Sequence, residues 1–436
     1  MKGDGKSGTS AIVREKPFKS SRVEGIAPLD RVREADYRWF MISTNWRRLL
    51  AWIIVLHLPA CTEGLFEPIR PVTRAAPVAP RPTPPLPDYR GPATRPFLMG
   101  FTRWPADLTR DGVAIAEDYA YAHGDIVSVT FIGGIPWAEA LDNKAYPQDV
   151  QFHLNYRPPA GKKLFLSISP LDKDRRGLAP YWGETDNQPL PPPWNREALN
   201  SARVKRAYLN FVLRAIETMQ PDYVAIGVEL NVLLSRNAEK WRQLKELHRD
   251  TYLAVKKLHK PLPVFFTADV LHYKRLVREA KGTQQEKEVM DLMRYSDLFA
   301  MSVYPHMSLE VPRPVPANFL DFATRFKRPV AVAESGMSSQ DVDMRSYSTL
   351  LRGSDADQYQ FTELLLKTAA RDYYEFVINF ASSDFERLVA RLQPPLDDLA
   401  RIWAYTGMQA SDKRPKPASA VWDGFYHAKY EQAKWW

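Results

Sequence analysis

The sequence predicts an α/β protein with a (β/α)8 barrel over residues 97–436. Short apolar segments alternate there with segments of helical periodicity, which is the pattern of a parallel sheet covered by helices. Two of these apolar segments, 223–231 and 329–336, each carry one glutamate two residues before their end, and this architecture carries its chemistry at the C-terminal ends of the strands. A doubly wound open sheet is the alternative fold, but no glycine-rich phosphate loop follows the first strand.

Eight strands are expected, each an apolar run bounded by polar or turn-forming residues. In chain order they are Phe97–Thr102, Asp125–Phe131, Lys163–Ser169, Tyr223–Leu230, Pro263–Asp269, Leu298–Val303, Pro329–Ala333 and Glu375–Ala381. Apolar residues at spacings of three and four predict helices over 204–219 and 241–258. The loops after the third and eighth strands, 170–194 and 382–417, are enlarged. The latter is expected to hold a short helix over Asp384–Leu392, and the final helix covers Ala418–Gln432.

The chain before the barrel divides into three segments. Residues 1–40 are polar and of mixed charge, which indicates a disordered extension or a start site placed upstream of the true one at Met41. Residues 41–61 are typical of a secretory signal: two arginines precede an apolar run too short to span a bilayer. Residues 62–96 contain ten prolines and predict an extended, semi-rigid linker.

The signal segment ends in Leu-Pro-Ala-Cys at 58–61, which resembles a bacterial lipobox. The resemblance implies that Cys61 is lipidated and that the barrel is anchored to a membrane outside the cytoplasm, in the periplasm or at the cell surface. An uncleaved membrane anchor or a plain signal peptide is the alternative. Because Cys61 is the only cysteine, a disulfide framework and a cysteine metal site are excluded.

Charge and composition narrow the class of function. The formal charge is +9, but residues 1–61 alone contribute +5, from 11 Lys/Arg and 6 Asp/Glu, which leaves +4 for the rest. The basic residues of the barrel are scattered rather than clustered, so nucleic acid binding has little support. The eight histidines form no metal-binding motif, and no Gly-x-Ser-x-Gly elbow is present. We expect no cofactor or metal, and a monomer.

A pair of glutamates on two barrel strands suits the hydrolysis of glycosidic bonds. Glu229 ends the fourth strand and Glu334 the seventh; one carboxyl donates a proton to the leaving oxygen while the other attacks the anomeric carbon. Asn231 lies two residues after Glu229, so strand alternation predicts that both side chains point the same way. The alternative for a single strand-end glutamate is a structural hydrogen bond or an arginine pair.

Four motifs resemble the clan A glycoside hydrolases, which are (β/α)8 barrels. Ile-Gly-Val-Glu-Leu-Asn at 226–231 is similar to a run in endo-β-1,4-galactanases and in some β-mannanases. Met-Ser-Val-Tyr-Pro-His at 301–306 is similar to the galactanase segment on strand 6, and Val-Ala-Glu-Ser-Gly at 332–336 to the strand 7 nucleophile motif. The stretch 411–418 resembles the segment that precedes the last helix in many clan A enzymes.

The resemblance implies a retaining glycoside hydrolase acting on a β-linked polysaccharide or oligosaccharide. Glu229 would be the acid/base, Glu334 the nucleophile, and Tyr304 the hydrogen-bond partner of Glu334. Side chains near the strand ends are candidate contacts to carbohydrate, because sugar rings stack on aromatic faces: Trp137, Trp182, His306, Asn231 and Trp403. Packing is the alternative for each tryptophan, and a structural hydrogen bond is the alternative for His306.

One departure from the family pattern supports a second hypothesis. Most clan A enzymes carry asparagine immediately before the acid/base, where this chain has Val228. The competing hypothesis is therefore a catalytically silent, lipid-anchored barrel that binds polysaccharide or assists its export.

Overall fold

The computed structural model describes residues 87–393 and 396–432 of the protein. The predicted extension, the signal segment with Cys61 and most of the proline-rich linker lie outside these residues, so those interpretations stay predictions. Among the residues that the structure describes, no helix is both long and apolar enough to cross a membrane.

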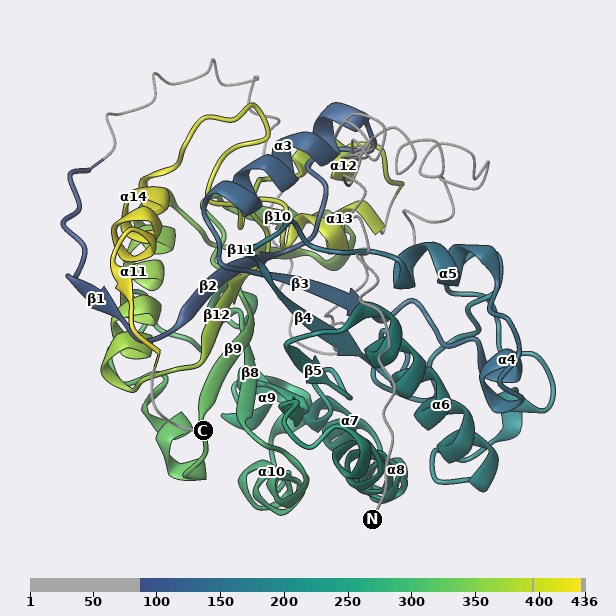
Figure 1. Ribbon diagram of the computed structural model, residues 1–436. Helices are drawn as coiled ribbons and strands as arrows, with labels where there is room; N and C mark the ends of the chain where they lie inside the picture. Colours follow the sequence, from purple (N-terminus) through teal and green to yellow (C-terminus); the bar gives the residue numbers. More distant parts are fainter. Residues whose placement is uncertain (1–86, 394–395, 433–436) are drawn as a thin grey trace, which may run out of the picture. The chain divides into compact units, whose positions relative to one another are not determined.

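Parallel strands pair in the order β6-β5-β4-β3-β2-β12-β9-β8-β7 (Figure 1). The two strands at the ends of this order, β6 and β7, are separated in the chain by Phe266 alone. The sheet is therefore an eight-stranded barrel whose fifth strand is interrupted once, which confirms the predicted fold. The strand bounds are β2 Leu98–Thr102, β3 Ile126–Phe131, β4 Lys163–Ile168, β5 Tyr223–Ala225, β6 Val264–Phe265, β7 Thr267–Asp269, β8 Phe299–Val303, β9 Val330–Ser335 and β12 Phe376–Asn379.

Side-chain alternation along the strands fills the barrel. One set of alternate residues, among them Phe165, Phe265 and Phe376, forms a closed apolar cluster in the interior. The ring of Phe165 lies 5.0 Å from that of Phe376 and 5.5 Å from that of Phe265, centroid to centroid. The other set packs outward against the helices. Bulky side chains thus fill the barrel as a core, and the chemistry is left to its ends.

Helices surround the barrel in the positions that the sequence predicts for most units (Figure 1). The helix 204–219 is α6 and the helix 241–258 is α8; Ser201 and Asn237 cap their N-termini by accepting backbone N–H bonds. The helix bounds are α3 Arg110–Ala122, α4 Trp137–Leu141, α5 Gln148–Leu154, α6 Ala202–Met219, α7 Asn231–Arg236, α8 Ala238–Leu258, α9 Val270–Tyr273, α10 Gln285–Leu292, α11 Asp355–Arg371, α12 Glu386–Val389, α13 Leu396–Arg401 and α14 Pro417–Tyr426.

The loops at the C-terminal ends of the strands build a second apolar cluster. The loops after β4 and β12 are long, as the sequence predicts. The loop after β9 is also enlarged, by an antiparallel hairpin of β10 (Val342–Met344) and β11 (Thr349–Leu351) that the sequence analysis does not anticipate. This hairpin packs with α12 and α13 in a cluster that includes Tyr304 and Trp403.

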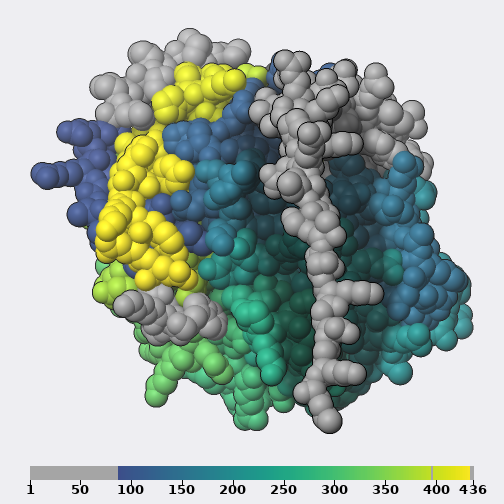
Figure 2. Space-filling model, in the orientation of Figure 1, coloured from purple at the N-terminus to yellow at the C-terminus, as the bar shows by residue number. Residues whose placement is uncertain are grey.

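Several predicted bounds differ from the structure by a few residues: the helix expected over Asp384–Leu392 is α12, Glu386–Val389, for example. The two largest differences are the end of strand 4 and the end of the last helix. Strand 4 ends at Ala225 rather than Leu230, because the chain leaves regular pairing there and Glu229 takes a left-handed backbone conformation with φ of 50°. The last helix ends at Tyr426, because the following residues pair as β13 (Lys429–Tyr430) with β1 (Thr94–Arg95). Figure 2 shows this C-terminal segment in yellow against the dark blue start of the described chain.

Candidate active site

Glu334 reaches the interior face of the barrel because of an irregularity in the sheet. Val330 and Val332 pack outward, and Ala331 and Ala333 inward, so simple alternation would turn Glu334 outward. The register between β8 and β9 shifts after Met301, so that Ser302 pairs with Glu334. The extra residue, Ala333, reverses the phase of the strand, as a β-bulge does near many active sites.

Tyr304, directly after β8, contacts this carboxyl. Its hydroxyl donates a hydrogen bond of 3.0 Å to Oε2 of Glu334, and both side chains are buried. Burial raises the pKa of Tyr304 well above its ordinary value, and the negative charges of Glu334, Glu229 and Asp269 raise it further. The hydroxyl therefore keeps its proton and acts as a donor. The carboxylates of Glu229, Asp269 and Glu334 all act on this one hydroxyl, so the three groups lie toward the same end of the barrel.

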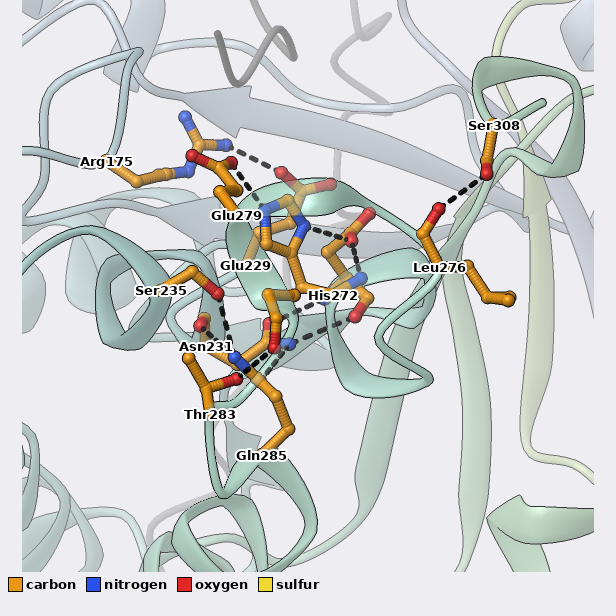
Figure 3. A network of polar contacts seen from close by, with 12 residues as sticks. Arg175, Glu229, Asn231, Ser235, His272, Leu276, Glu279, Thr283, Gln285 and Ser308 are labelled. Carbon is orange, nitrogen blue, oxygen red and sulfur yellow. Dashed lines mark hydrogen bonds and ion pairs between the residues drawn. The ribbon is translucent and has the colours of Figure 1, made fainter. Parts of the chain in front are cut away.

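Glu229 lies in the irregular segment between β5 and α7 and forms a buried ion pair. Its backbone N–H donates to Oγ1 of Thr267 over 2.8 Å, which fixes the turn against β7. Nη2 of Arg175, from the long loop after β4, lies 3.2 Å from Oε2 of Glu229, and each side chain is 2% exposed (Figure 3). An arginine at this distance favours the ionised form of the carboxyl.

A third carboxylate, Asp269 at the end of β7, opens a chain of buried charges. Its Oδ1 lies 2.6 Å from Nδ1 of His272, whose Nε2 lies 2.7 Å from Oε1 of Glu279 (Figure 3). Arg236 closes the chain with two bonds of 3.2 Å to Glu279. Burial alone would lower the pKa of His272, but Asp269 and Glu279 outweigh it and raise the pKa to about 9. His272 is thus an imidazolium at neutral pH.

Asn231 does not share a face with Glu229, so the prediction from strand alternation is wrong. It is the first residue of α7 and is completely buried. Its amide donates 3.0 Å bonds to the carbonyl of Asp269 and to Oε1 of Gln285, and its own oxygen accepts the N–H of Asp269 over 2.8 Å. Asn231 therefore joins α7 to β7 and α10.

Two of the three tryptophans predicted to contact sugar, Trp137 and Trp182, are buried in packed surroundings. Trp137 is fully buried, donates its indole N–H to the carbonyl of Ala179 and stacks on Trp194. Trp182 donates to Oδ2 of Asp149 over 2.7 Å and packs edge-on against Phe131. These contacts favour packing over a sugar platform for both side chains.

His306 and Trp403 lie nearer the site. The ring centroids of both are within 6.4 Å of the ring of Tyr304. Nε2 of His306 lies 2.9 Å from the carbonyl oxygen of Ile402, and burial lowers the pKa of this histidine to about 4. His306 is thus neutral and ties the loop after β8 to the loop after β12. The contact of Trp403 or His306 with carbohydrate stays a prediction.

Arg175 is a site residue that the sequence analysis misses. It stands in Asp-Lys-Asp-Arg-Arg-Gly at 172–177, where a turn rich in charge gives no signal that one arginine is buried. Its proximity to Glu229 depends on a contact between residues 54 positions apart. Within the described residues, no group of three His, Cys, Asp or Glu side chains is arranged to hold a metal ion.

Comparison with known proteins agrees with this geometry. The model of glycosyl hydrolase family 53 matches residues 179–385, a stretch that contains Glu229, Tyr304 and Glu334. The GH5_18 protein of Streptomyces cattleya, solved in complex with Manβ1-4GlcNAc, superposes with a TM-score of 0.54 at 14% identity, over 77% of this chain and 82% of that one. No curated protein sequence gives a significant match.

Two further solved structures are more distant. Exo-β-1,4-mannosidase Op5Man5 from Opitutaceae bacterium strain TAV5 has a TM-score of 0.49 at 14% identity, over 80% of this chain and 62% of that one. Bacteroides uniformis β-glucuronidase 2 has a TM-score of 0.42 at 12% identity, over 73% of this chain. The chain spans only about a third of that β-glucuronidase, 34% of its length.

The strand order and the superposition on the GH5_18 protein show that the fold is a (β/α)8 barrel. Residues 179–385, the stretch that contains Glu229, Tyr304 and Glu334, are similar to glycosyl hydrolase family 53.

The charge chain around His272 predicts a pH-dependent stability. The pKa of His272 is raised in the folded state, to about 9, above the value of about 6.5 expected on unfolding. Its stabilisation is therefore complete below about pH 6.5 and is lost as the pH rises through about 9. The shift corresponds to on the order of 3 kcal/mol. Urea denaturation at pH 6.5 and 9.5 measures how much the free energy of unfolding falls over this range. The fall should be smaller for His272→Gln than for the wild type.

His248→Gln is the matched control for this measurement. His248 is also buried, and its Nε2 lies 2.8 Å from the carbonyl oxygen of Tyr295. Burial lowers its pKa to about 4, so its titration contributes little to the change in stability between pH 6.5 and 9.5. A wild-type stability that is flat over this range would contradict the charged His272.

Proposed function

We propose that this protein hydrolyses a β-linked glycan with retention of configuration, Glu334 acting as nucleophile and Glu229 as acid/base. The observation that carries the proposal is the position of Tyr304. Its protonated hydroxyl donates to Glu334, and the charge of Glu229 acts on the same hydroxyl. Both observations support a function in which the carboxyl groups of Glu334 and Glu229 act on one substrate at this end of the barrel.

In the first step, Glu334 attacks the anomeric carbon while Glu229 gives its proton to the glycosidic oxygen. The bond from the anomeric carbon to the leaving oxygen breaks, and a glycosyl ester on Glu334 forms. In the second step Glu229 takes a proton from water, the water oxygen bonds to the anomeric carbon, and the ester bond to Glu334 breaks. Tyr304 stabilises Glu334 as an anion before attack and as the departing group afterwards.

A silent barrel that only binds polysaccharide is the competing function. Val228 differs from the usual asparagine, but its side chain is buried, and its carbonyl accepts a hydrogen bond of 3.1 Å from Nε of Arg175. The backbone at this position thus takes part in the arrangement of Glu229. Because the carboxylates and the tyrosine are all present in one cluster, the enzymatic function has the stronger support.

Glu334→Gln is expected to abolish hydrolysis, with a loss in kcat of roughly 10⁴-fold or more, because the amide cannot form the glycosyl ester. Reducing-sugar release from a panel of β-glycans measures this loss, and the anomeric NMR signal of the first product reports retention. Glu375→Gln is the matched control, since Glu375 is also buried but precedes β12 at the opposite end of the barrel. A Glu334→Gln protein as active as the wild type would refute the assignment. If glycan in an affinity gel slows the migration of the protein but no glycan is cleaved, the silent barrel is favoured.

Tyr304→Phe removes one charge-assisted hydrogen bond to the nucleophile. Such a bond contributes about 1.5–3 kcal/mol, so kcat/KM should fall about 10- to 100-fold. The apolar ring contacts of Tyr304 remain, so the variant should fold, but the buried carboxyl of Glu334 loses a hydrogen-bond donor and the thermal midpoint should fall. Activity equal to that of the wild type would show that Tyr304 does not assist Glu334.

The lipobox-like segment leads us to propose that the barrel is anchored outside the cytoplasm through lipidated Cys61. The proline-rich linker then spaces the barrel from the lipid surface. In cells that express the full chain, Cys61→Ser should move the protein from the membrane fraction to the soluble fraction and abolish labelling by a radioactive fatty acid. Fatty-acid labelling that persists in Cys61→Ser would contradict this anchor.

A further inference from the structure

The ion pair between Arg175 and Glu229 conflicts with the simplest account of a general acid. A general acid must carry its proton when substrate is bound. In this structure a guanidinium lies 3.2 Å from the carboxyl oxygen, and both groups are shielded from water, so screening of their attraction by solvent is small. The neutral form of Glu229 is therefore disfavoured in the free protein.

Arg175 is itself held rigidly, so its guanidinium is not free to swing away. Its Nε donates to the carbonyl of Val228 over 3.1 Å, and its Nη1 donates to the carbonyl of Lys173 over 2.7 Å. Its Nη2 is the atom that approaches Glu229. One side chain thus bridges the loop after β4 to the irregular segment after β5, where Glu229 takes its left-handed conformation.

Other charged groups face Glu229 from neighbouring elements. The charge of Glu229 raises the pKa of Tyr304 after β8, as do the charges of Glu334 on β9 and Asp269 on β7. Figure 3 shows His272 on α9 and Glu279 in the same close-up view as the pair of Arg175 and Glu229. The carboxylates among these groups favour a proton on Glu229, whereas Arg175 and the imidazolium of His272 oppose it. Arg175 is the cation in direct contact.

We propose that Arg175 is a positioning residue that fixes the orientation of Glu229 and holds it in its ionised form before substrate binds. This inference rests on the proposed function and deepens it. An ionised Glu229 is ready to act as the base in the second step but must first gain a proton from solvent for the first step. Formation of the glycosyl ester therefore limits turnover, and activity is greatest on the acidic side of neutrality.

The test is the pH profile of kcat/KM for Arg175→Met and Arg175→Gln, measured on an unactivated glycan that the wild type cleaves. Loss of the Arg175 cation should move the alkaline limb of the kcat/KM profile to higher pH by at least about one unit. The reason is that a neighbouring cation typically lowers the pKa of a carboxyl by that much or more. With a 2,4-dinitrophenyl glycoside, whose leaving group needs no proton, the two variants should keep the wild-type profile on this limb. An unmoved alkaline limb with the glycan would overturn the proposal.

Arg95→Met is the matched control. Arg95 is equally buried and pairs with Asp125 at 2.9 Å, where the chain enters β2 and β3 at the opposite end of the barrel. Its loss should lower stability and leave the pH profile unchanged. If the alkaline limb of the kcat/KM profile moves as far in Arg95→Met as in the Arg175 variants, the effect comes from lost stability. That result would overturn the role of Arg175.

A direct titration covers the case in which no Arg175 variant folds. The ¹³C signal of the Glu229 carboxyl, identified by its absence in Glu229→Gln, should titrate below the range of an ordinary glutamate in the wild-type protein. Titration above that range would overturn the proposal. The two failures are distinguishable: a wild type that cleaves no glycan removes the proposed function, whereas cleavage with an unmoved limb or a high Glu229 titration removes only the role of Arg175.

Discussion

The cost of burying charge governs the active end of this barrel. Three buried carboxylates, those of Glu229, Asp269 and Glu334, lie there at or after the ends of strands, and an isolated buried carboxylate is strongly unfavourable. Each therefore has a compensating group: Glu334 accepts from the Tyr304 hydroxyl, Glu229 pairs with Arg175, and Asp269 contacts the His272 imidazolium. Removing one partner would leave an uncompensated charge, so these residues stabilise the site as a set.

Charge compensation is one requirement on Glu229 and Glu334, and the proposed catalysis is another. In the proposed mechanism the nucleophile Glu334 has to stay ionised, and the neutral hydroxyl of Tyr304 favours this state without a formal charge. The proposed acid/base, Glu229, has to change its protonation state during the cycle, and its arginine partner opposes the protonated state. Under this proposal, the surroundings of the site oppose the protonation of Glu229 rather than the attack by Glu334.

The framework behind the site is an ordinary packed barrel with two local irregularities. The shift between β8 and β9 turns Glu334 to the interior face, and the break in pairing after Ala225 lets Glu229 adopt a left-handed conformation. Strained or bulged backbone of this kind persists only where its surroundings hold it in place. Two hydrogen bonds stabilise the conformation of Glu229 here. The N–H of Glu229 donates to Thr267, and Arg175 donates to the carbonyl of Val228.

The sequence by itself determined the architecture, because apolar runs alternating with helical periodicity have few solutions other than a closed parallel barrel. It also predicted that Glu229, Tyr304 and Glu334 lie at the same end of the barrel, since the C-terminal ends of parallel strands share one end. The tertiary structure decided which side chains enter the site and which pack elsewhere, because alternation along one strand does not determine this. It turned Asn231 into a link between α7, β7 and α10, buried Trp137 and Trp182 in packing, and brought Arg175 onto Glu229 across 54 residues. Local pattern fixes which face a regular strand presents, whereas bulges, loop conformations and long-range ion pairs depend on the packing of the whole chain.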